Sequence, residues 1–274
     1  MKKIIKNILS IIFDFIGYEI VLYSKKPKHT IRNNYGLNLN IGSGDYHLTD
    51  FISLDLDSER YHKNDKDKYI SYDIRKDSLP FSNSEVDNIY ISHVVEHIEN
   101  NFVQNLFNEC FRVLKKGGVL RIATPDAEFL YEVSSFDNSY WTWRRHWFEN
   151  PENVSGNFDA NSLSQMDYFI KMIATPKSRY YKNKIVNDDK NFEYGKNTYE
   201  DIVNSLTNNL SFRYKFPGDH INYWDFNKVK TFGKNSGFTN IIKSKYLGSV
   251  SEIMRRNEFD QKAVMMSLYV DLVK

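Results

Sequence analysis

Apolar residues recur with two different spacings along the chain, and each spacing predicts a different kind of element. Residues 37–41 alternate apolar and polar side chains and run into Gly42, which predicts a strand followed by a tight turn. Residues 100–114 carry apolar side chains at helical spacing and close on two lysines and two glycines, which are typical of a helix C-terminus. Further strands are predicted at 51–56, 69–72, 86–92, 119–123, 239–246 and 265–273, and a further helix at 226–235. This alternation predicts an α/β fold with a largely parallel sheet.

The alternation of strands and helices stops between residues 127 and 220. This stretch is rich in aromatic residues, asparagine and lysine, and helical spacing returns only near 161–174 and 198–210. We therefore expect an α-rich inserted cap at 127–220, which contributes an acceptor-binding region. It interrupts a sheet domain formed by residues 35–126 and 221–274.

The N-terminal residues 2–23 are basic first and then apolar, but Lys6, Asn7, Asp14 and Glu19 interrupt the apolar run. A signal peptide has an unbroken apolar region, and a membrane span has about 20 predominantly apolar residues. The segment fits an amphipathic helix instead. Two interpretations stay open: the helix packs on the domain, or it rests on the inner surface of the membrane as a peripheral contact. The polar residues 24–34, with Pro27, are expected to form a linker, so residues 1–34 stand apart as helix and linker.

The composition is that of an ordinary globular chain. Of the 274 residues, 41% are hydrophobic, and the formal net charge of +2 gives no field that would attract nucleic acid. The single cysteine, Cys110, cannot form an internal disulfide and lies among apolar neighbours, so we expect a core residue in a reducing, cytoplasmic environment. Neither a carboxylate triad nor a histidine cluster is visible in the sequence, so no metal is expected.

Two features point to a nucleotide. Gly42 and Gly44 after the first strand leave room for backbone N–H groups to approach a ligand. A dinucleotide fingerprint would have a third glycine where His47 stands, which argues against a nicotinamide or flavin cofactor. Asp55, with Asp57 as second candidate, ends the next strand and can accept hydrogen bonds from ribose hydroxyls. It follows Gly44 by only 11 residues, so the first crossover helix must be short or degenerate.

Four blocks of sequence carry a family resemblance. LNLNIGSGD, ISLDLD, YDIRKDSLPFSNSEVDNIYISHVVEHI and LFNECFRVLKKGGVLRIATPD resemble the class I S-adenosylmethionine-dependent methyltransferases. The likeness is greatest to the small-molecule group that includes bacterial cell-surface polysaccharide methyltransferases, and it covers about residues 36–126 and 220–274. It implies a Rossmann-like sheet, mostly parallel with an antiparallel last strand, and S-adenosylmethionine as cofactor with S-adenosylhomocysteine as product.

The resemblance also implies which residues contact the cofactor. They lie after four successive strands: the glycine turn beside the methionine end, the ribose-binding acid, the adenine-binding acid and the tip of the fourth strand. Position by position these are Asn40, Gly42, Ser43 and Gly44; Asp55 and Leu56; Asp73 and Ile74; and Ser92, His93 and Val94.

A histidine is the expected base for a hydroxyl acceptor, because it titrates near neutrality. The candidates are His93, His97, His146 and His220, and His220 is ranked first, ahead of His97 and His146. His97 and His146 each have a structural role as the alternative. The aromatic and arginine residues at 141–147 form either a sugar or nucleotide platform or one buried helix face. Six cations, Lys177, Arg179, Lys182, Lys184, Arg213 and Lys215, suit either a phosphorylated acceptor or a solvated face.

The expected activity is O-methylation of a sugar or sugar-linked group in capsule or lipopolysaccharide synthesis, with a small-molecule acceptor as partner and no nucleic acid. Two alternatives stay open. One is a nucleotide-sugar oxidoreductase or epimerase on a Rossmann sheet, and the other is a non-catalytic methyltransferase-like partner subunit.

Overall fold

A computed structural model of the chain describes residues 36–56, 69–135, 139–149, 163–178 and 197–274. The helix predicted at 2–23 and its linker lie outside the described residues, as does Asp57. Among the helices that are described, none is both long and apolar enough to cross a membrane.

The centre of the molecule is one seven-stranded sheet with the order β3-β2-β1-β4-β5-β7-β6. The strands are β1 (Asn38–Ile41), β2 (Ile52–Asp55), β3 (Tyr69–Ser71), β4 (Val86–Ser92), β5 (Leu114–Pro125), β6 (Asn240–Ser244) and β7 (Ser267–Val273). The five strands β1 to β5 pair in parallel with one another, whereas β7 runs antiparallel to both of its neighbours, β5 and β6. The first five strands thus follow the doubly wound order, and the predicted Rossmann-like sheet with an antiparallel last strand is confirmed.

The order of the strands reverses at β1, which lies between β2 and β4. All four residues of β1 are buried, and Leu39 and Ile41 are fully covered, because helices or loops pack on both faces of a parallel sheet. In doubly wound folds the crevice outside the carboxyl ends of the strands, at such a reversal, is the usual place for a ligand.

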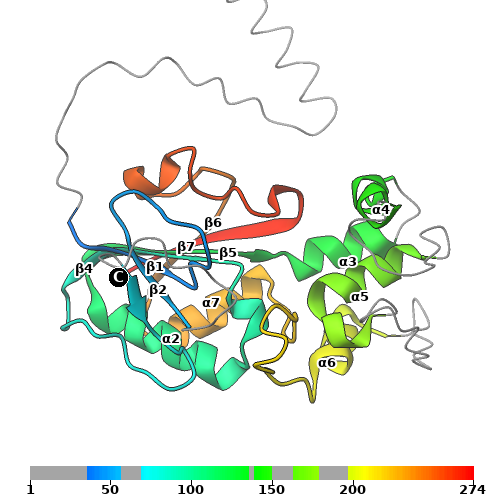
Figure 1. Cartoon of the computed structure of the whole chain (residues 1–274), viewed down its shortest axis with the longest axis horizontal. Coiled ribbons are helices and arrows are strands. Elements are labelled where there is room, and N and C mark those ends of the chain that lie inside the picture. Colours follow the sequence, from blue (N-terminus) through cyan, green and yellow to red (C-terminus); the bar gives the residue numbers. More distant parts are fainter. Residues whose placement is uncertain (1–35, 57–68, 136–138, 150–162, 179–196) are drawn as a thin grey trace, which may run out of the picture. The chain divides into compact units, whose positions relative to one another are not determined.

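One face of the sheet is covered by two helices, α2 (Asn100–Val113) and α7 (Phe226–Asn235) (Figure 1). They pack together over the sheet, with Phe107 of α2 stacked on Trp224 just before α7. The buried Cys110 belongs to this core, as expected. Strand β5 begins at Leu114, directly after α2 and earlier than predicted, because residue 114 already pairs with Val86.

Within the described residues, no α-helix covers the opposite face, which is covered by the loop 42–51 and by residues 245–266 (Figure 1). The first crossover is therefore made of turns rather than a helix. Phe51 from the loop and Phe259 from the second segment meet edge to face, and Phe259 also contacts Tyr90 of β4. These aromatic contacts form a second core.

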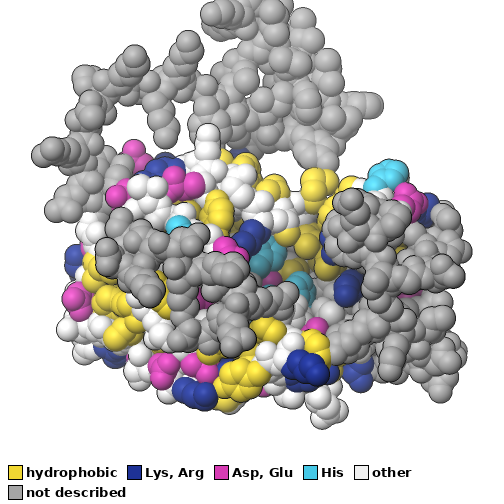
Figure 2. Space-filling model, in the orientation of Figure 1, with side chains coloured by type: hydrophobic (Ala, Val, Ile, Leu, Met, Phe, Trp, Pro, Cys, Tyr) yellow, Lys and Arg dark blue, Asp and Glu magenta, His cyan; other side chains and the backbone are white. Residues whose placement is uncertain are grey.

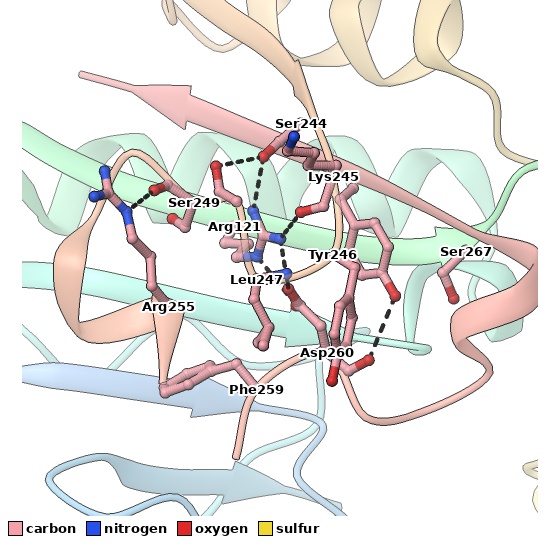
Figure 3. Close-up of polar contacts among 12 residues, drawn as sticks. Arg121, Ser244, Lys245, Tyr246, Leu247, Ser249, Arg255, Phe259, Asp260 and Ser267 are labelled. Carbon is pink, nitrogen blue, oxygen red and sulfur yellow. Dashed lines mark hydrogen bonds and ion pairs between the residues drawn. The ribbon is translucent and has the colours of Figure 1, made fainter. Parts of the chain in front are cut away.

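The segment 245–266 is held by a buried charged group, which the sequence reading did not identify. Arg121 of β5 is 0% exposed and forms an ion pair with Asp260 at 2.6 Å (Figure 3). It forms a second ion pair with Asp271 at 3.0 Å. Its guanidinium also donates to the carbonyl oxygen of Lys245. The N–H of Leu247 and the hydroxyl of Tyr90 donate to Asp260, so the buried carboxylate is hydrogen-bonded on both oxygens.

The described residues of the cap form four α-helices with a core of their own, gathered beyond the end of β5 in Figure 1. They are α3 (Ala127–Ser135), α4 (Thr142–Glu149), α5 (Gln165–Ile173) and α6 (Tyr199–Thr207). Capping boxes start two of them, Ser164 with Asp167 and Thr198 with Asp201, which explains where these helices begin. An α-rich insertion between β5 and α7 is thus present.

Candidate functional site

A cavity of about 440 Å³ opens at the reversal of strand order. The residues that follow four successive strands line it: Gly42 and Gly44 after β1, Asp55 and Leu56 after β2, Asp73 and Ile74 after β3, and His93 and Val94 after β4. Phe212, Pro217, Gly218 and Lys262 complete the wall from outside these strands. Figure 2 shows histidine side chains in a hollow near the middle of this face. The volume falls within the range of about 300–1,000 Å³ for small-molecule sites.

The turn after β1 has no room for a side chain at Gly42. Gly42 has a φ of +69°, and a Cβ there would lie 2.3 Å from Cγ2 of Val94. Its N–H donates to the carbonyl oxygen of Leu54, which fixes the turn against β2. Glycine is therefore required by both the backbone conformation and the close packing.

Asp55 ends β2 beside this turn. One carboxylate oxygen accepts from the N–H of Gly44 at 2.5 Å and the other from the N–H of Leu56 at 2.6 Å. Burial raises the pKa of Asp55, and these two N–H donors oppose that effect. Each oxygen keeps a further lone pair, so the carboxylate can still accept from a diol in the cavity.

Asp73 has a different environment from the one that the resemblance implies. Both of its oxygens accept from the guanidinium of Arg75, at 2.9 and 3.1 Å, and the hydroxyl of Tyr214 donates to it at 3.3 Å. Burial alone would raise the pKa of Asp73, but the hydrogen bonds of Arg75 outweigh it and lower the value. Arg75 lies 3.9 Å from the ring centroid of Phe212 and 4.4 Å from that of Tyr214. Asp73 therefore holds Arg75 at the cavity wall, against two aromatic rings of the cap.

Three of the residues assigned by resemblance do not line the cavity. Asn40 is buried within β1, and its amide donates to the carbonyl oxygen of Tyr46 at 2.8 Å. Ser43 is buried in the turn, and its hydroxyl donates to the carbonyl oxygen of Gly44. Ser92 is buried at the end of β4. The first two support the shape of the turn rather than present a group to a ligand.

A cluster of three histidines and one glutamate lies against one wall of the cavity. His93 follows β4 with a φ of +55°, a strained conformation for a residue other than glycine, and the short helix η2 (Val95–His97) follows at once. Nδ1 of the His93 ring lies 3.0 Å from Oε1 of Glu96, and Nε2 of the same ring lies 2.9 Å from the hydroxyl of Ser267. Glu96 is 1% exposed. Although burial would raise its pKa, His93, with His97 and His220, lowers it to about 2.

His97 and His220 meet in this cluster from distant parts of the chain. Their rings lie edge to face with centroids 4.8 Å apart. His97 lines the cavity, whereas His220 lies behind it and is not among the lining residues. Burial and the neighbouring His97 lower the pKa of His220 to about 4, so its ring is neutral at pH 7. The structure thus gives His97, rather than the first-ranked His220, access to the cavity.

The third candidate base, His146, lies elsewhere. Its side chain is 70% exposed on α4 and pairs with Glu149, and it does not line the cavity. On the preceding turn Trp141 is 2% exposed, stacks on Tyr168 and donates to Ser134, so this tryptophan belongs to the cap core and is no platform. Arg213, one of the cap cations, is paired with Asp219.

Several residues in the cavity wall or directly behind it were not identified from the sequence. Glu96 directly precedes His97 in the sequence, and an acid next to a candidate histidine is the signal that could have identified it. Arg75 and Phe212 come together only through the cap, and Lys262 reaches the wall from a segment without any regular hydrophobic spacing. No local pattern in the sequence announces such contacts.

Comparison with known proteins identifies part of the chain. Residues 39–122 match the family described as a methyltransferase domain. The match spans β1 to most of β5 and so includes the four strand ends that line the cavity. No curated protein matches the chain significantly.

Two solved structures are among those similar to the chain. An S-adenosylmethionine-dependent methyltransferase from Mesorhizobium loti is 14% identical with a TM-score of 0.40, over 87% of this chain and 91% of the other. One from Archaeoglobus fulgidus is 13% identical with a TM-score of 0.43, over 87% of this chain and 86% of the other.

The cavity fits the cofactor of such a domain. The matched domain and the fold support S-adenosylmethionine as cofactor and S-adenosylhomocysteine as product. A turn with no room for a Cβ at Gly42, a carboxylate with lone pairs to spare and apolar side chains at Leu56 and Ile74 are present at adjoining strand ends. Such a set suits a ligand with a polar amino-acid end, a diol and a flat apolar ring.

Proposed function

We propose that the chain is an S-adenosylmethionine-dependent methyltransferase that methylates a hydroxyl of a sugar or sugar-linked acceptor. The observation that carries the first part is the cavity at the strand-order reversal within the segment that matches a methyltransferase domain. Bound S-adenosylmethionine supplies an electrophilic methyl group on a positively charged sulfur.

The proposal assigns each wall of the cavity a part in binding. Asp55 accepts from the ribose hydroxyls, and the turn at Gly42 and Gly44 lets the amino-acid end lie against backbone. Leu56 and Ile74 flank the adenine, with Phe212 of the cap on the same wall. Arg75, held by Asp73, stabilises Phe212 and Tyr214 and so ties the cap segment to the sheet. His93 and Val94 border the methionine portion.

The acceptor would enter from the side of the cap. Pro217 and Gly218 line the cavity next to His97, and the N–H groups of Ile221 and Asn222 donate to the carbonyl oxygen of Glu96. The chain that leaves the cap is thus attached to η2 at the point where the histidine cluster meets the cavity. Holding the acceptor oxygen in line with the methyl can lower the barrier by about 7–11 kcal/mol. The cluster of Glu96, His97 and His220 would accept the proton that the acceptor hydroxyl loses.

The support for a sugar acceptor is the resemblance of the sequence blocks to polysaccharide methyltransferases, together with a cavity wall that combines polar and aromatic groups. The proposed setting is surface-polysaccharide synthesis, in capsule or lipopolysaccharide, at the cytoplasmic side of the membrane.

The test is transfer of an isotope-labelled methyl group to a panel of nucleotide-sugars and polysaccharide fragments, followed by mass spectrometry. The expected result is a product heavier by one methyl group on a sugar hydroxyl. Transfer only to amine or carboxylate acceptors would reject the sugar assignment and retain the methyltransferase.

A further inference from the structure

We infer that Glu96, His97 and His220 form a binding site for a divalent first-row transition-metal ion, of which Zn²⁺ is the probe. The site does not depend on the proposed methyl transfer for its formation. Each residue offers one ligand atom, and these atoms lie within 4.8 Å of one another. Two imidazoles and one carboxylate are the donor set of many catalytic zinc and iron(II) sites.

Hydrogen bonds fix which nitrogen carries the proton in the rings of His97 and His220. Nδ1 of His97 lies 2.9 Å from the carbonyl oxygen of Asp219, and Nδ1 of His220 contacts the carbonyl oxygen of Met172. A carbonyl oxygen only accepts, so each Nδ1 must carry the proton. In the neutral rings both Nε2 atoms therefore keep their lone pairs. A backbone carbonyl that holds the opposite ring nitrogen is the arrangement that orients metal-binding histidines.

The carboxylate of Glu96 is anchored through one of its two oxygens. Oε2 of Glu96 accepts from the hydroxyl of Thr124 at 3.2 Å, which leaves Oε1 toward the histidines. Oε1 is buried and faces two imidazoles, with Nδ1 of His93 at 3.0 Å and Nε2 of His97 at 4.0 Å. A buried carboxylate oxygen is costly unless a proton donor or a cation stands beside it, and a cation on the His97 side would meet that need. Each of the three ligand residues thus has one polar atom anchored, and their ligand atoms lie within 4.8 Å of one another.

The backbone that carries the three ligand residues is fixed by hydrogen bonds. Glu96 and His97 lie on η2, whose carbonyl oxygen at Val95 accepts from the indole of the buried Trp224. His220 is fixed through its backbone, since its N–H donates to Thr175 and its carbonyl oxygen accepts from the N–H of Thr175. Zinc–nitrogen bonds of about 2.0–2.1 Å require ligand atoms about 3.3 Å apart, so small side-chain rotations from the present separations complete the site.

The position gives the ion a use. Because His97 lines the cavity, an ion held here lies at the wall next to the expected acceptor. A metal ion there lowers the pKa of a bound hydroxyl and polarises it. This use rests on the proposed function, whereas the binding of the ion does not.

The test is calorimetric titration of Zn²⁺ into the full chain after dialysis against a chelator. One site per chain is expected, with affinity at least about 10-fold weaker in Glu96→Gln and in His220→Asn. The asparagine can keep an N–H donor for Met172 while it removes Nε2. His146→Ala, on the exposed face of α4, is the matched control and should bind as the unaltered chain does. Circular dichroism of each variant verifies the fold.

A second readout remains if a variant fails to fold. Co²⁺ added to the unaltered chain should produce visible absorption bands of a four- or five-coordinate ion that disappear when Zn²⁺ is added. No Zn²⁺ binding and no such bands would overturn the inference, as would equal affinity in folded Glu96→Gln. S-adenosylhomocysteine titrated into the same sample keeps the two proposals apart. Binding of it without Zn²⁺ binding rejects only the metal site, and the converse rejects only the methyltransferase.

Discussion

The carboxylate of Asp55 accepts a hydrogen bond from the backbone N–H of Gly44 at 2.5 Å, so the acid at the end of β2 also fixes the glycine turn after β1. The residue expected to bind the ribose and the turn expected to bind the methionine end are therefore one unit. A change at Asp55 alters both halves of the cofactor site.

Asp55→Asn should weaken S-adenosylhomocysteine binding about 10- to 100-fold, since each hydrogen bond to a charged group contributes about 1.5–3 kcal/mol. The amide offers only one acceptor oxygen where Gly44 and Leu56 both donate. Isothermal titration measures the loss. Asp50→Asn is the control, because Asp50 is exposed near the end of the same loop and pairs with Arg256. Equal affinity in both variants would contradict the ribose assignment.

Gly42→Ala should abolish detectable cofactor binding. The added Cβ would lie 2.3 Å from Val94 and would occupy a φ of +69°. Gly117→Ala separates the two effects, because Gly117 has a φ of +80° with nothing within 4 Å of its Cβ position. The backbone penalty of about 1–2 kcal/mol is common to both, so urea unfolding should show it in both variants. Cofactor binding lost equally in both would place the cause in global stability rather than in the turn.

Arg121→Met should destabilise the fold by about 3–5 kcal/mol, because it leaves two buried carboxylates, Asp260 and Asp271, without their cation. The free energy of unfolding in urea gives the value. Lys115→Met removes an ion pair whose side chains are 46% and 29% exposed, and it should cost less than about 1 kcal/mol. Comparable losses in the two variants would show that the buried group is not what holds residues 245–266.

Stability should rise with pH through the half-buried Lys228. Its ammonium donates to Asn222 and Tyr223, and burial lowers its pKa from 10.5 to about 7. Between these two values the unfolded chain binds a proton that the folded chain does not, so the free energy of unfolding increases as pH rises. The slope for one group is at most about 1.4 kcal/mol per pH unit.

The measurement for Lys228 is the difference in unfolding free energy between the unaltered chain and Lys228→Met at pH 7, 8 and 9. This difference should grow in favour of the unaltered chain. Lys230→Met, at an exposed position two residues further along α7, should show no such trend. A difference that stays constant with pH would mean that Lys228 keeps its proton in the folded state.

The sequence predicted the sheet well where the hydrophobic pattern is local. Strand β4 and helix α7 were predicted with their observed bounds, because an uninterrupted period specifies each of them. Within the segment 245–266, residues 247–264 were not assigned any structure, and the two ends were predicted as parts of strands that the structure ends at Ser244 and begins at Ser267. The placement of this segment depends on Arg121 meeting Asp260, two residues far apart in the chain that form their ion pair only once the sheet exists.

The site was partly predictable for the same reason. Asp55 ends a strand, Gly42 and His93 directly follow strands, and the ends of parallel strands meet at one edge of the sheet. His97 and His220 come together only because the chain returns from the cap to η2. No spacing of residues in the sequence predicts this return. Asp73 lines the cavity as the resemblance implies, but no pattern in the sequence predicted that Arg75, two residues later, donates to both of its oxygens.

The central claim is that the cavity at the ends of β1 to β4 binds the methyl donor. Isothermal titration of S-adenosylhomocysteine into the folded, unaltered chain tests it directly, with NAD titrated in parallel. The account predicts one molecule of S-adenosylhomocysteine bound per chain and no heat of binding from NAD. Heat from NAD alone, or from neither ligand, would contradict it.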